Sequence, residues 1–462
     1  MDIEFGTDGW RTVVEEFTTP RVRAVGQAVA DYVHEEAAGE GRPAVAVGYD
    51  PREGSRPAAE ELARVLCVNG VDAHVPDRDT PTPVVAWTVT DRGLDGALQV
   101  TASHNPPTYN GIKFVPADGA PALPGVTDRL ADNLRAPDPR PESEWGVVEE
   151  GDFLDDYIDA ALAFADADLE GVTVAHDAMF GSGRGVTDEL LGRAGADVLR
   201  LRGGNDPEFG GTPPEPTGER LGELVARVET GDADLGVAND GDADRLGVVT
   251  PRRGFVDPNW VFAGLYDYLL SEGDGGDAVR TVSTTFLVDR VAESHGAAVH
   301  ETPVGFKWVA EAMADHDAPL GGEESGGFGV TDHLRNKDGV LVALLVAAAH
   351  AAEPLDDRLD RIRDTHGDIV QDRVSVDCPD ERKAAVVDAL DGEIPDDVAG
   401  TAVKEVGTAD GFKLLLADGS WLLVRPSGTE PKLRVYAEAG DDARVAELLE
   451  AGTDIVRPLV RY

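Results

Sequence analysis

The stretch Gly96-Ala-Leu-Gln-Val-Thr-Ala-Ser103 is a short apolar run that leads directly into a polar loop. The same pattern, with an amphipathic segment after the loop, recurs at Ala44–Asp50, Val172–Asp177, Leu235–Asp240 and Thr281–Thr285. Runs that are apolar throughout are typical of strands buried on both faces, as in a parallel sheet covered by helices. The pattern therefore predicts an α/β fold, with helices expected at 57–66 and 341–350. It also directs the search for a site to the loops beyond the strands.

Changes in this pattern predict four domains, which are residues 1–145, 146–252, 253–367 and 368–462. A proline-rich linker at 135–143 marks the first boundary. The first three domains share the strand–loop–helix order of α/β units with mixed, mostly parallel sheets. The last domain is predicted to be a smaller antiparallel α+β domain that ends in an acidic helix from Asp442. Its expected strands are 411–416, 420–425 and 433–437.

The chain has 462 residues, and 41 lysines and arginines stand against 88 aspartates and glutamates, which gives a net charge of −47. A surface this acidic argues against nucleic acids or anionic membranes as partners. The two cysteines, Cys67 and Cys378, form no CxxC pair, so neither a disulfide framework nor a thiolate metal site is expected. Because no signal peptide is recognisable and no apolar run reaches 18 residues, we expect a cytoplasmic protein.

The excess of acidic residues predicts adaptation to a salt-rich cytoplasm, as in a halophile. At about 1 M salt the Debye length is about 3 Å, so repulsion between surface carboxylates is largely screened. An acidic surface in a mesophile is the alternative. Lysine is rare, which makes each lysine informative, and the seven are Lys113, Lys307, Lys337, Lys383, Lys404, Lys413 and Lys432.

The segment Thr101-Ala-Ser-His-Asn-Pro-Pro-Thr-Tyr-Asn-Gly-Ile-Lys-Phe114 places Ser103 directly after a predicted strand. Pro106 and Pro107 restrict the loop backbone, so the Ser103 hydroxyl is a candidate nucleophile held in a fixed position. Lys113 adds one of the rare lysine charges. An ordinary turn capped by Ser103 is the alternative. The G-x-S-x-G motif of hydrolases is absent, which weakens an esterase interpretation.

The segment Asp240-Gly-Asp-Ala-Asp-Arg245 also follows a predicted strand and alternates three carboxylates with small residues. This alternation places the carboxylates on one side of an extended loop, where hard oxygen ligands suit Mg²⁺. Arg245 beside them is suited to a phosphate oxygen. In so acidic a chain, a solvated acidic loop remains the alternative.

Two further segments supply candidate ligands for a sugar phosphate. In Leu320-Gly-Gly-Glu-Glu-Ser-Gly-Gly327, Glu323 and Ser325 can hydrogen-bond sugar hydroxyls where glycines allow close approach. The segment Arg425-Pro-Ser-Gly-Thr-Glu-Pro-Lys-Leu-Arg434 offers hydroxyls, backbone N–H groups and a guanidinium in a tight turn, which predicts a phosphate cradle. Ordinary turns are the alternative for both segments.

These four segments, together with Phe5-Gly-Thr-Asp-Gly-Trp-Arg11, resemble the α-D-phosphohexomutase superfamily, which includes phosphoglucomutase, phosphomannomutase and phosphoglucosamine mutase. The motifs follow the order of the family over essentially the whole chain. The resemblance implies three related α/β domains and a smaller C-terminal α+β domain around a central cleft. Gly327 departs from the pattern, because many members have a histidine there, and this leaves the choice of acid and base open between Lys337 and His104.

The resemblance also implies site residues and cofactors. The implied residues are Ser103, His104, Lys113, Arg11 and Lys337 for catalysis, Ser103, Asp240, Asp242 and Asp244 for the metal, and Arg245, Gly305, Lys307, Glu323, Ser325, Arg425, Ser427, Gly428 and Thr429 for the substrate. One Mg²⁺ per chain is implied, with hexose 1,6-bisphosphate as activator.

The implied activity is interconversion of hexose 1-phosphate and hexose 6-phosphate through a phosphoserine enzyme and a hexose 1,6-bisphosphate. Glucose is the first expectation for the hexose and mannose the second. The alternatives are a phosphoglucosamine mutase, a serine phosphomonoesterase, and a sugar-phosphate-binding module without activity. The expected partners are small sugar phosphates, without nucleic acid or membrane, in a monomer or homodimer.

Overall fold

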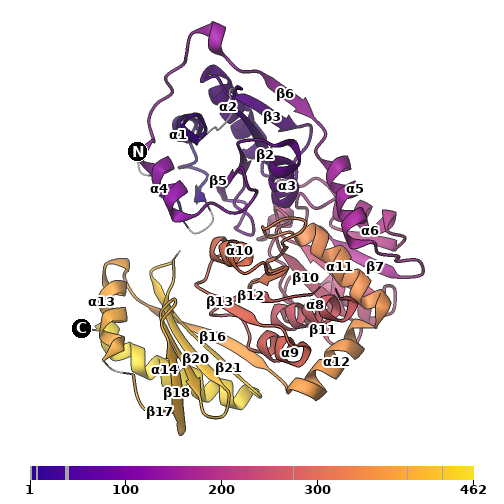
Figure 1. The fold of residues 1–462 in the computed structure, drawn as a ribbon, viewed down its shortest axis with the longest axis vertical. Helices are drawn as coiled ribbons and strands as arrows, with labels where there is room; N and C mark the ends of the chain where they lie inside the picture. Colours follow the sequence, from indigo (N-terminus) through magenta and orange to yellow (C-terminus); the bar gives the residue numbers. More distant parts are fainter. Residues whose placement is uncertain are drawn as a thin grey trace.

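The computed structural model describes residues 3–6, 9–36, 41–273, 275–392, 394–428 and 430–461. Within these residues the strands form four sheets, and the chain passes through four units in order, each built on one sheet (Figure 1). In the view of Figure 1 the first unit lies at the top, the second on the right, the third below the first, and the fourth at the lower left.

The first unit has the strand order β1-β5-β4-β2-β3-β6. Strands β4, β2, β3 and β6 run parallel, and β5 and β1 are antiparallel additions at one edge. Because β6 pairs with β3, this sheet extends beyond residue 145 and the proline-rich linker. The elements are β1 (Trp10–Val13), α1 (Thr19–Glu36), β2 (Ala44–Tyr49), α2 (Ser55–Val68), β3 (Asp72–Pro76), α3 (Thr82–Arg92), β4 (Gly96–Val100), β5 (Tyr109–Pro116), α4 (Pro124–Asp132), a 3-10 turn at Glu142–Glu144, and β6 (Val148–Gly151).

The second unit has the order β11-β10-β9-β7-β8, with β7 parallel to both neighbours and β10 and β11 antiparallel. The pairing of β11 with β10 extends this sheet beyond residue 252. The elements are α5 (Leu154–Ala165), β7 (Thr173–Asp177), α6 (Thr187–Arg193), β8 (Asp197–Leu201), a 3-10 turn at Phe209–Gly211, α7 (Gly222–Glu229), β9 (Leu235–Asn239), β10 (Leu246–Thr250) and β11 (Gly254–Val256).

The third unit has the order β13-β12-β14-β15. The prediction of a strand at 281–285 was wrong, because β12 ends at Thr281 and a turn follows. The hydroxyl of Thr281 lies 2.8 Å from that of Thr284, and such local side-chain bonds compete with the ladder of a strand. The elements are α8 (Pro258–Glu272), β12 (Ala278–Thr281), α9 (Leu287–His295), β13 (Val299–Thr302), α10 (Phe306–Asp315), β14 (Leu320–Gly322), β15 (Phe328–Val330), α11 (Gly339–Ala352) and α12 (Leu355–His366).

The fourth unit is an antiparallel sheet of order β16-β21-β20-β19-β18-β17 with two helices, which confirms the predicted α+β character. The elements are β16 (Val370–Asp377), α13 (Asp380–Asp391), β17 (Asp397–Val398), β18 (Thr401–Gly407), β19 (Phe412–Leu416), β20 (Trp421–Pro426), β21 (Lys432–Ala439) and α14 (Asp442–Arg461).

The largest hydrophobic core is continuous through the first three units, and Val85, Tyr157, Phe262 and Leu344 belong to it. The fourth unit has a separate core between its sheet and helices. The first three units therefore form one packed body, and the fourth joins it through a smaller contact. Among the described helices none alone has the length and apolar character to cross a bilayer. Only α11 and α12 taken together, bent by 81°, meet those criteria.

Candidate active site

Ser103 lies in the loop between β4 and β5, three residues after the strand ends at Val100. Its backbone has φ of 50°, which is uncommon for a residue other than glycine and is typical of functional sites, and its side chain is fully buried. The Oγ donates a hydrogen bond to Oδ2 of Asp240 at 2.8 Å. Nδ1 of His104 lies 3.3 Å from the Oγ of Ser103. The loops of the first and second units therefore meet at the candidate nucleophile.

Arg52, which the sequence analysis did not identify, holds this loop through hydrogen bonds to its backbone. It is buried, and its Nε donates to Oδ2 of Asp50 at 2.9 Å. Its two Nη groups donate to carbonyl oxygens of Ser103 (2.7 Å), Asn105 (2.8 Å), Pro106 (2.7 Å) and Tyr109 (3.1 Å). One guanidinium therefore fixes the backbone of the candidate nucleophile and of the loop that follows it.

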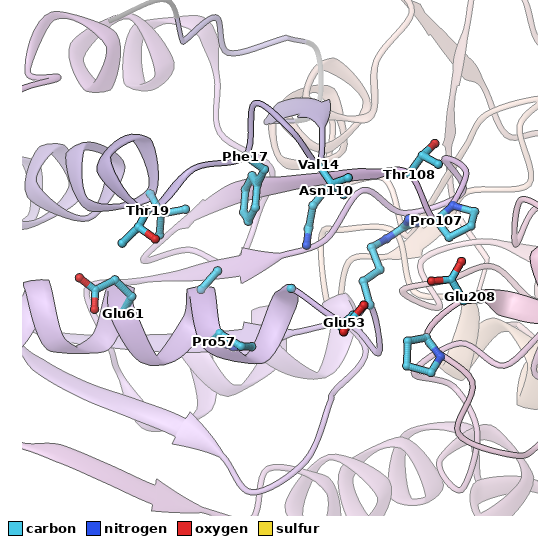
Figure 2. Close-up of a pocket in the computed structure, with 15 residues that line it drawn as sticks. Val14, Phe17, Thr19, Glu53, Pro57, Glu61, Pro107, Thr108, Asn110 and Glu208 are labelled. Carbon is cyan, nitrogen blue, oxygen red and sulfur yellow. The ribbon is translucent and has the colours of Figure 1, made fainter.

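A pocket of about 430 Å³ is lined in part by the same loop (Figure 2). Pro107 and Thr108 of the loop, Phe17 and Glu61 line it together with Arg52. Ser103 does not line this pocket. The pocket is therefore separate from the candidate site for phosphoryl transfer.

The acidic loop between β9 and β10 places the carboxylates of Asp240, Asp242 and Asp244 together in the interior. Nζ of Lys113 donates to Oδ2 of Asp242 at 2.8 Å and to Oδ2 of Asp244 at 2.9 Å. Thr82 donates to Oδ2 of Asp242 at 2.6 Å. Burial raises the pKa of Asp240 well above its usual range, and the neighbouring carboxylates raise it further. Arg245 opposes the rise, and a cation bound among the three carboxylates would oppose it further.

The three carboxylates fit a hard divalent cation. Their ligand oxygens lie within 4.8 Å of one another, and all three residues are buried. Oδ1 of Asp242 is buried and accepts no hydrogen bond from the described residues. An all-oxygen set with the Ser103 hydroxyl beside it is the donor chemistry that Mg²⁺ prefers. Asp240, Asp242, Asp244 and Ser103 are therefore the residues that could hold Mg²⁺.

Asn239, at the end of β9, fixes the acidic loop and was also missed by the sequence. Its Nδ2 donates to the carbonyl oxygens of Arg245 and Gly339, each at 3.0 Å, and its Oδ1 accepts from Thr187 at 2.7 Å. The glycine-rich segment 181–185 packs against the same loop, because the Ser182 N–H donates to the Gly241 carbonyl oxygen at 3.0 Å.

His104 lies among cations. Arg245, then burial, then Arg11 lower the pKa of His104 far below its usual range, so its imidazole is neutral beside Ser103. Arg11, on β1, donates to Oδ1 of Asn105 at 3.0 Å. The neutral ring can accept or donate a hydrogen bond while the surrounding guanidinium groups supply fixed positive charge.

Glu323 lies in the turn between β14 and β15, where Ser325 follows it. Its Oε1 accepts the Gly305 N–H at 3.1 Å. Burial raises the pKa of Glu323 to about 7, against the attraction of Lys337, and Glu324 adds to the rise. A carboxylate that titrates near neutrality and is held by a backbone N–H is well placed to accept hydrogen bonds from hydroxyls.

Lys337 reaches the acidic loop from the third unit, and its Nζ lies 2.8 Å from Oδ2 of Asp244. A Cβ added at Gly327 would lie 2.5 Å from Cδ of Lys337, so the glycine makes room for the lysine stem. The preceding residue, Asn336, donates to the Gly119 carbonyl of the first unit at 2.9 Å. The absence of a side chain at 327 is therefore coupled to the position of this lysine.

Arg425 lies near the end of β20, and Ser427 and Gly428 begin the turn toward β21. Thr429 lies outside the described residues. The turn is held from α13 by Lys383, whose Nζ donates to the carbonyl oxygens of Ser427 (2.5 Å) and Glu430 (2.6 Å). Lys307, at the start of α10, has its ammonium 5.7 Å from the ring centre of Trp308.

The structure therefore brings the serine loop, the acidic loop, Lys113 and Lys337 into one buried group drawn from three units. Glu323 adjoins it through the electrostatic influence of Lys337. The C-terminal turn belongs to the fourth unit, which Figure 1 shows at the lower left, below the first unit.

Comparison with known proteins gives matches along the whole chain. The models "Phosphoglucomutase/phosphomannomutase, alpha/beta/alpha domain" I, II and III match residues 2–140, 155–254 and 257–365, and the model of the C-terminal domain matches 374–454. A Methanopyrus kandleri protein named "Probable phosphoglucosamine mutase" is 34% identical, with 99% of this chain and 98% of the relative covered. A Thermococcus kodakarensis protein named "Phosphopentomutase" is 32% identical, with 99% and 98% covered. The crystal structure of a phosphoglucomutase/phosphomannomutase family protein from Burkholderia thailandensis has a TM-score of 0.84 and 25% identity, with 98% of this chain and 97% of that chain covered.

Proposed function

The chain belongs to the phosphoglucomutase/phosphomannomutase family of intramolecular phosphotransferases, and from this premise we propose that it interconverts hexose 1-phosphates and hexose 6-phosphates, glucose phosphates first and mannose phosphates second. The observation that carries the proposal is the Ser103 Oγ, buried 2.8 Å from Asp240 in one group with the acidic loop and Lys113. A serine, three carboxylates and fixed cations are the groups that phosphoryl transfer requires.

In this proposal Ser103 carries a phosphoryl group and gives it to the free hydroxyl of a hexose monophosphate. The bond between phosphorus and Oγ of Ser103 breaks as the bond between phosphorus and the sugar oxygen forms. The resulting hexose 1,6-bisphosphate returns its other phosphoryl group to Ser103. Lys113 and Arg245 stabilise the charge of the transferring group, while Arg52 keeps the serine in place. Mg²⁺, held by Asp240, Asp242 and Asp244, would add positive charge opposite the phosphoryl oxygens.

The sugar proton needs an acceptor, and Lys337 and His104 are the candidates. His104 is kept neutral by its cationic neighbours, and its ring is 3.3 Å from Ser103 Oγ. Lys337 lies against Gly327 and Asp244, on the side of the Glu323 turn. We therefore assign His104 to the serine oxygen and Lys337 to the sugar oxygen. The Lys337 ammonium, paired with Asp244, donates its proton to the sugar oxygen that the phosphoryl group leaves, and the neutral amine that results accepts the proton of the next attacking hydroxyl. Glu323 and Ser325 hold neighbouring hydroxyls, and residues 425–429 hold the other phosphate.

The test combines intact-mass analysis with a coupled assay in multimolar KCl. The purified protein should carry one phosphoryl group, located on Ser103 by peptide mapping, and Ser103→Ala should lack both this mass and the activity. A chain that releases inorganic phosphate without forming the isomer would instead be a serine phosphomonoesterase. Binding of sugar phosphates without turnover, in both the wild-type protein and Ser103→Ala, would leave only a binding module.

Substrate preference is decided by the same assay with glucose, mannose and glucosamine 1-phosphates, Mg²⁺ and a trace of hexose 1,6-bisphosphate. Ribose 1-phosphate belongs in the panel because one relative is named a phosphopentomutase. We expect the highest kcat/KM for glucose 1-phosphate. Preference for glucosamine 1-phosphate would replace glucose in the proposal and leave the phosphoryl transfer unchanged.

A further inference from the structure

The fourth unit touches the third through a carboxylate beside the candidate phosphate arginine. Oδ2 of Asp410, in the turn between β18 and β19, accepts the Nε–H of Arg425 at 2.8 Å. The same oxygen accepts the backbone N–H of Val304, from the turn between β13 and α10, at 3.2 Å. One oxygen atom of the fourth unit therefore holds both its own arginine and a backbone group of the third.

The turn that carries Asp410 is built to approach Arg425 closely. The next residue, Gly411, has φ of +85°, and a Cβ there would lie 2.2 Å from the Val424 carbonyl oxygen and 2.8 Å from Cα of Arg425. Only glycine combines this backbone conformation with such close packing. The contact between Asp410 and Arg425 is thus set by the backbone on both sides.

Val304 leads directly to the sugar-binding turn. It precedes Gly305, whose N–H donates to Oε1 of Glu323 at 3.1 Å. Three hydrogen bonds and one peptide bond therefore join the guanidinium of Arg425 to the carboxylate of Glu323. They run through Asp410, Val304 and Gly305. The two units have separate main cores and share a small apolar cluster of Val282, Trp421, Leu423 and Tyr436. This series of hydrogen bonds is therefore one of the contacts that set the relative position of the two units.

We propose that Asp410 is a positioning residue that couples the phosphate subsite of the fourth unit to the sugar subsite of the third. By holding Nε it orients the plane of the Arg425 guanidinium, which sets how that group meets a phosphate. By holding the Val304 N–H it ties the arginine to the segment that supports Glu323. The inference rests on the proposed function, because Arg425 must be a phosphate ligand for the coupling to matter.

A double-mutant cycle with Asp410→Ala and Arg425→Ala tests the proposal. The readouts are kcat and KM for glucose 1-phosphate and the competitive inhibition constant of inorganic phosphate. Asp410→Ala should raise both KM and the inhibition constant about tenfold, as expected for a lost charge-assisted hydrogen bond, with a smaller change in kcat. In the Arg425→Ala background the same change should alter them less than about twofold. Asp410→Asn, which keeps an acceptor for Val304, should lie between wild type and Asp410→Ala.

The matched control is Asp418→Ala. Its carboxylate pairs with Arg444 on the same unit at 3.2 Å and has no part in the site. It should leave both constants within about twofold while showing whether loss of an ion pair alone destabilises the unit. Effects of Asp410→Ala and Arg425→Ala that simply multiply, or an Asp410→Ala enzyme with unchanged constants, would overturn the coupling and leave the mutase intact. Unchanged constants in Arg425→Ala would remove the phosphate subsite, and the coupling with it.

Discussion

At the scale of single residues, the site depends on how one guanidinium uses its five N–H groups. Arg52 directs four hydrogen bonds at the carbonyl oxygens of the serine loop and one at Asp50. Carbonyl groups of a tight loop would otherwise be buried without partners. The left-handed backbone of Ser103 is therefore maintained by a side chain about 50 residues away, which no local sequence pattern reveals.

Arg52→Lys tests this account. Lysine keeps the charge beside Asp50 but lacks the planar fork, so the loop loses most of its hydrogen bonds. We expect kcat to fall at least tenfold with KM within about twofold, and the free energy of unfolding to fall by about 2 kcal/mol. Steady-state kinetics and urea unfolding measure both. The control is Arg56→Lys, an exposed residue in the first turn of α2 that is paired with Glu60. Wild-type kcat in Arg52→Lys would refute the account.

Glu323 makes a pH dependence predictable. Burial, with Glu324, raises its pKa to about 7, while Lys337 and Arg245 oppose the rise. Hydroxyl groups donate to the ionised carboxylate, so kcat/KM should increase as the pH rises through about 7. The effect on stability has the opposite sign. Because the folded state holds the Glu323 proton more tightly than the unfolded state does, the contribution of Glu323 to the free energy of unfolding is lost as the pH rises from 4.5 toward 7.

Glu323→Gln is the control for that pH profile. The substrate phosphate also titrates, near pH 6, and this step should remain in the variant. We expect the rise near pH 7 to disappear in Glu323→Gln, with kcat/KM lower at every pH above it. A variant that keeps the same rise would assign it to another group.

At the scale of elements, helix α11 begins where two units meet. Asp338 caps it by accepting the Val340 and Leu341 N–H groups at 3.1 and 2.9 Å, one residue after Lys337. The hydroxyl of Tyr157, on α5, donates to the same carboxylate at 2.7 Å. Burial, followed by the charge of Asp338, raises the pKa of Tyr157, so the phenol stays protonated as the donor.

Tyr157→Phe should therefore cost more than an ordinary buried hydroxyl. Removing a donor to a buried carboxylate should lower the free energy of unfolding by about 2 kcal/mol. Because Lys337 is adjacent to the cap, kcat should also fall several-fold. Tyr266→Phe is the matched control, since its buried hydroxyl donates to a neutral carbonyl, that of Gly276, at 2.7 Å. Its cost should be about 1 kcal/mol, with unchanged kcat. Equal effects of the two substitutions on both quantities would contradict the prediction.

The sequence predicted the elements better than the contacts between them. Fully apolar runs located β2, β4, β7 and β9 to within a few residues, because burial on both faces leaves a local signal. The run at 281–285 misled because its hydroxyl residues bond to one another in a turn. Ser103 and the acidic loop could be found from their local motifs. Arg52, Asn239 and Asp410 could not, because their partners lie far away in the chain and only the folded structure brings them together.

At the scale of the whole molecule, charge is divided between inside and outside. Lys113, Lys337 and Lys413 are buried and bonded to carboxylates, so much of the lysine charge serves the interior. The net charge of the chain is −47, so the surface carries a large excess of carboxylates. Exposed Asp155 shows the result, because Asp152 beside it raises the pKa of its carboxyl. Ionised surface carboxylates therefore oppose the folded state wherever salt does not screen them.

We predict that the urea midpoint of unfolding rises steeply with KCl and that most of the rise occurs below about 1 M, where the Debye length falls from about 10 Å to about 3 Å. A salting-out effect would instead continue to grow above this range, so the shape of the curve separates the two causes. Asp155→Asn should raise the midpoint in 0.1 M KCl and leave it unchanged in 3 M, since it removes a repelled charge. Lys404→Gln, which removes an exposed cation, should do the opposite at low salt. Equal urea midpoints in 0.1 and 3 M KCl, with neither variant changing the midpoint, would contradict the prediction. They would show that packing within the core of the first three units outweighs the repulsion between surface carboxylates.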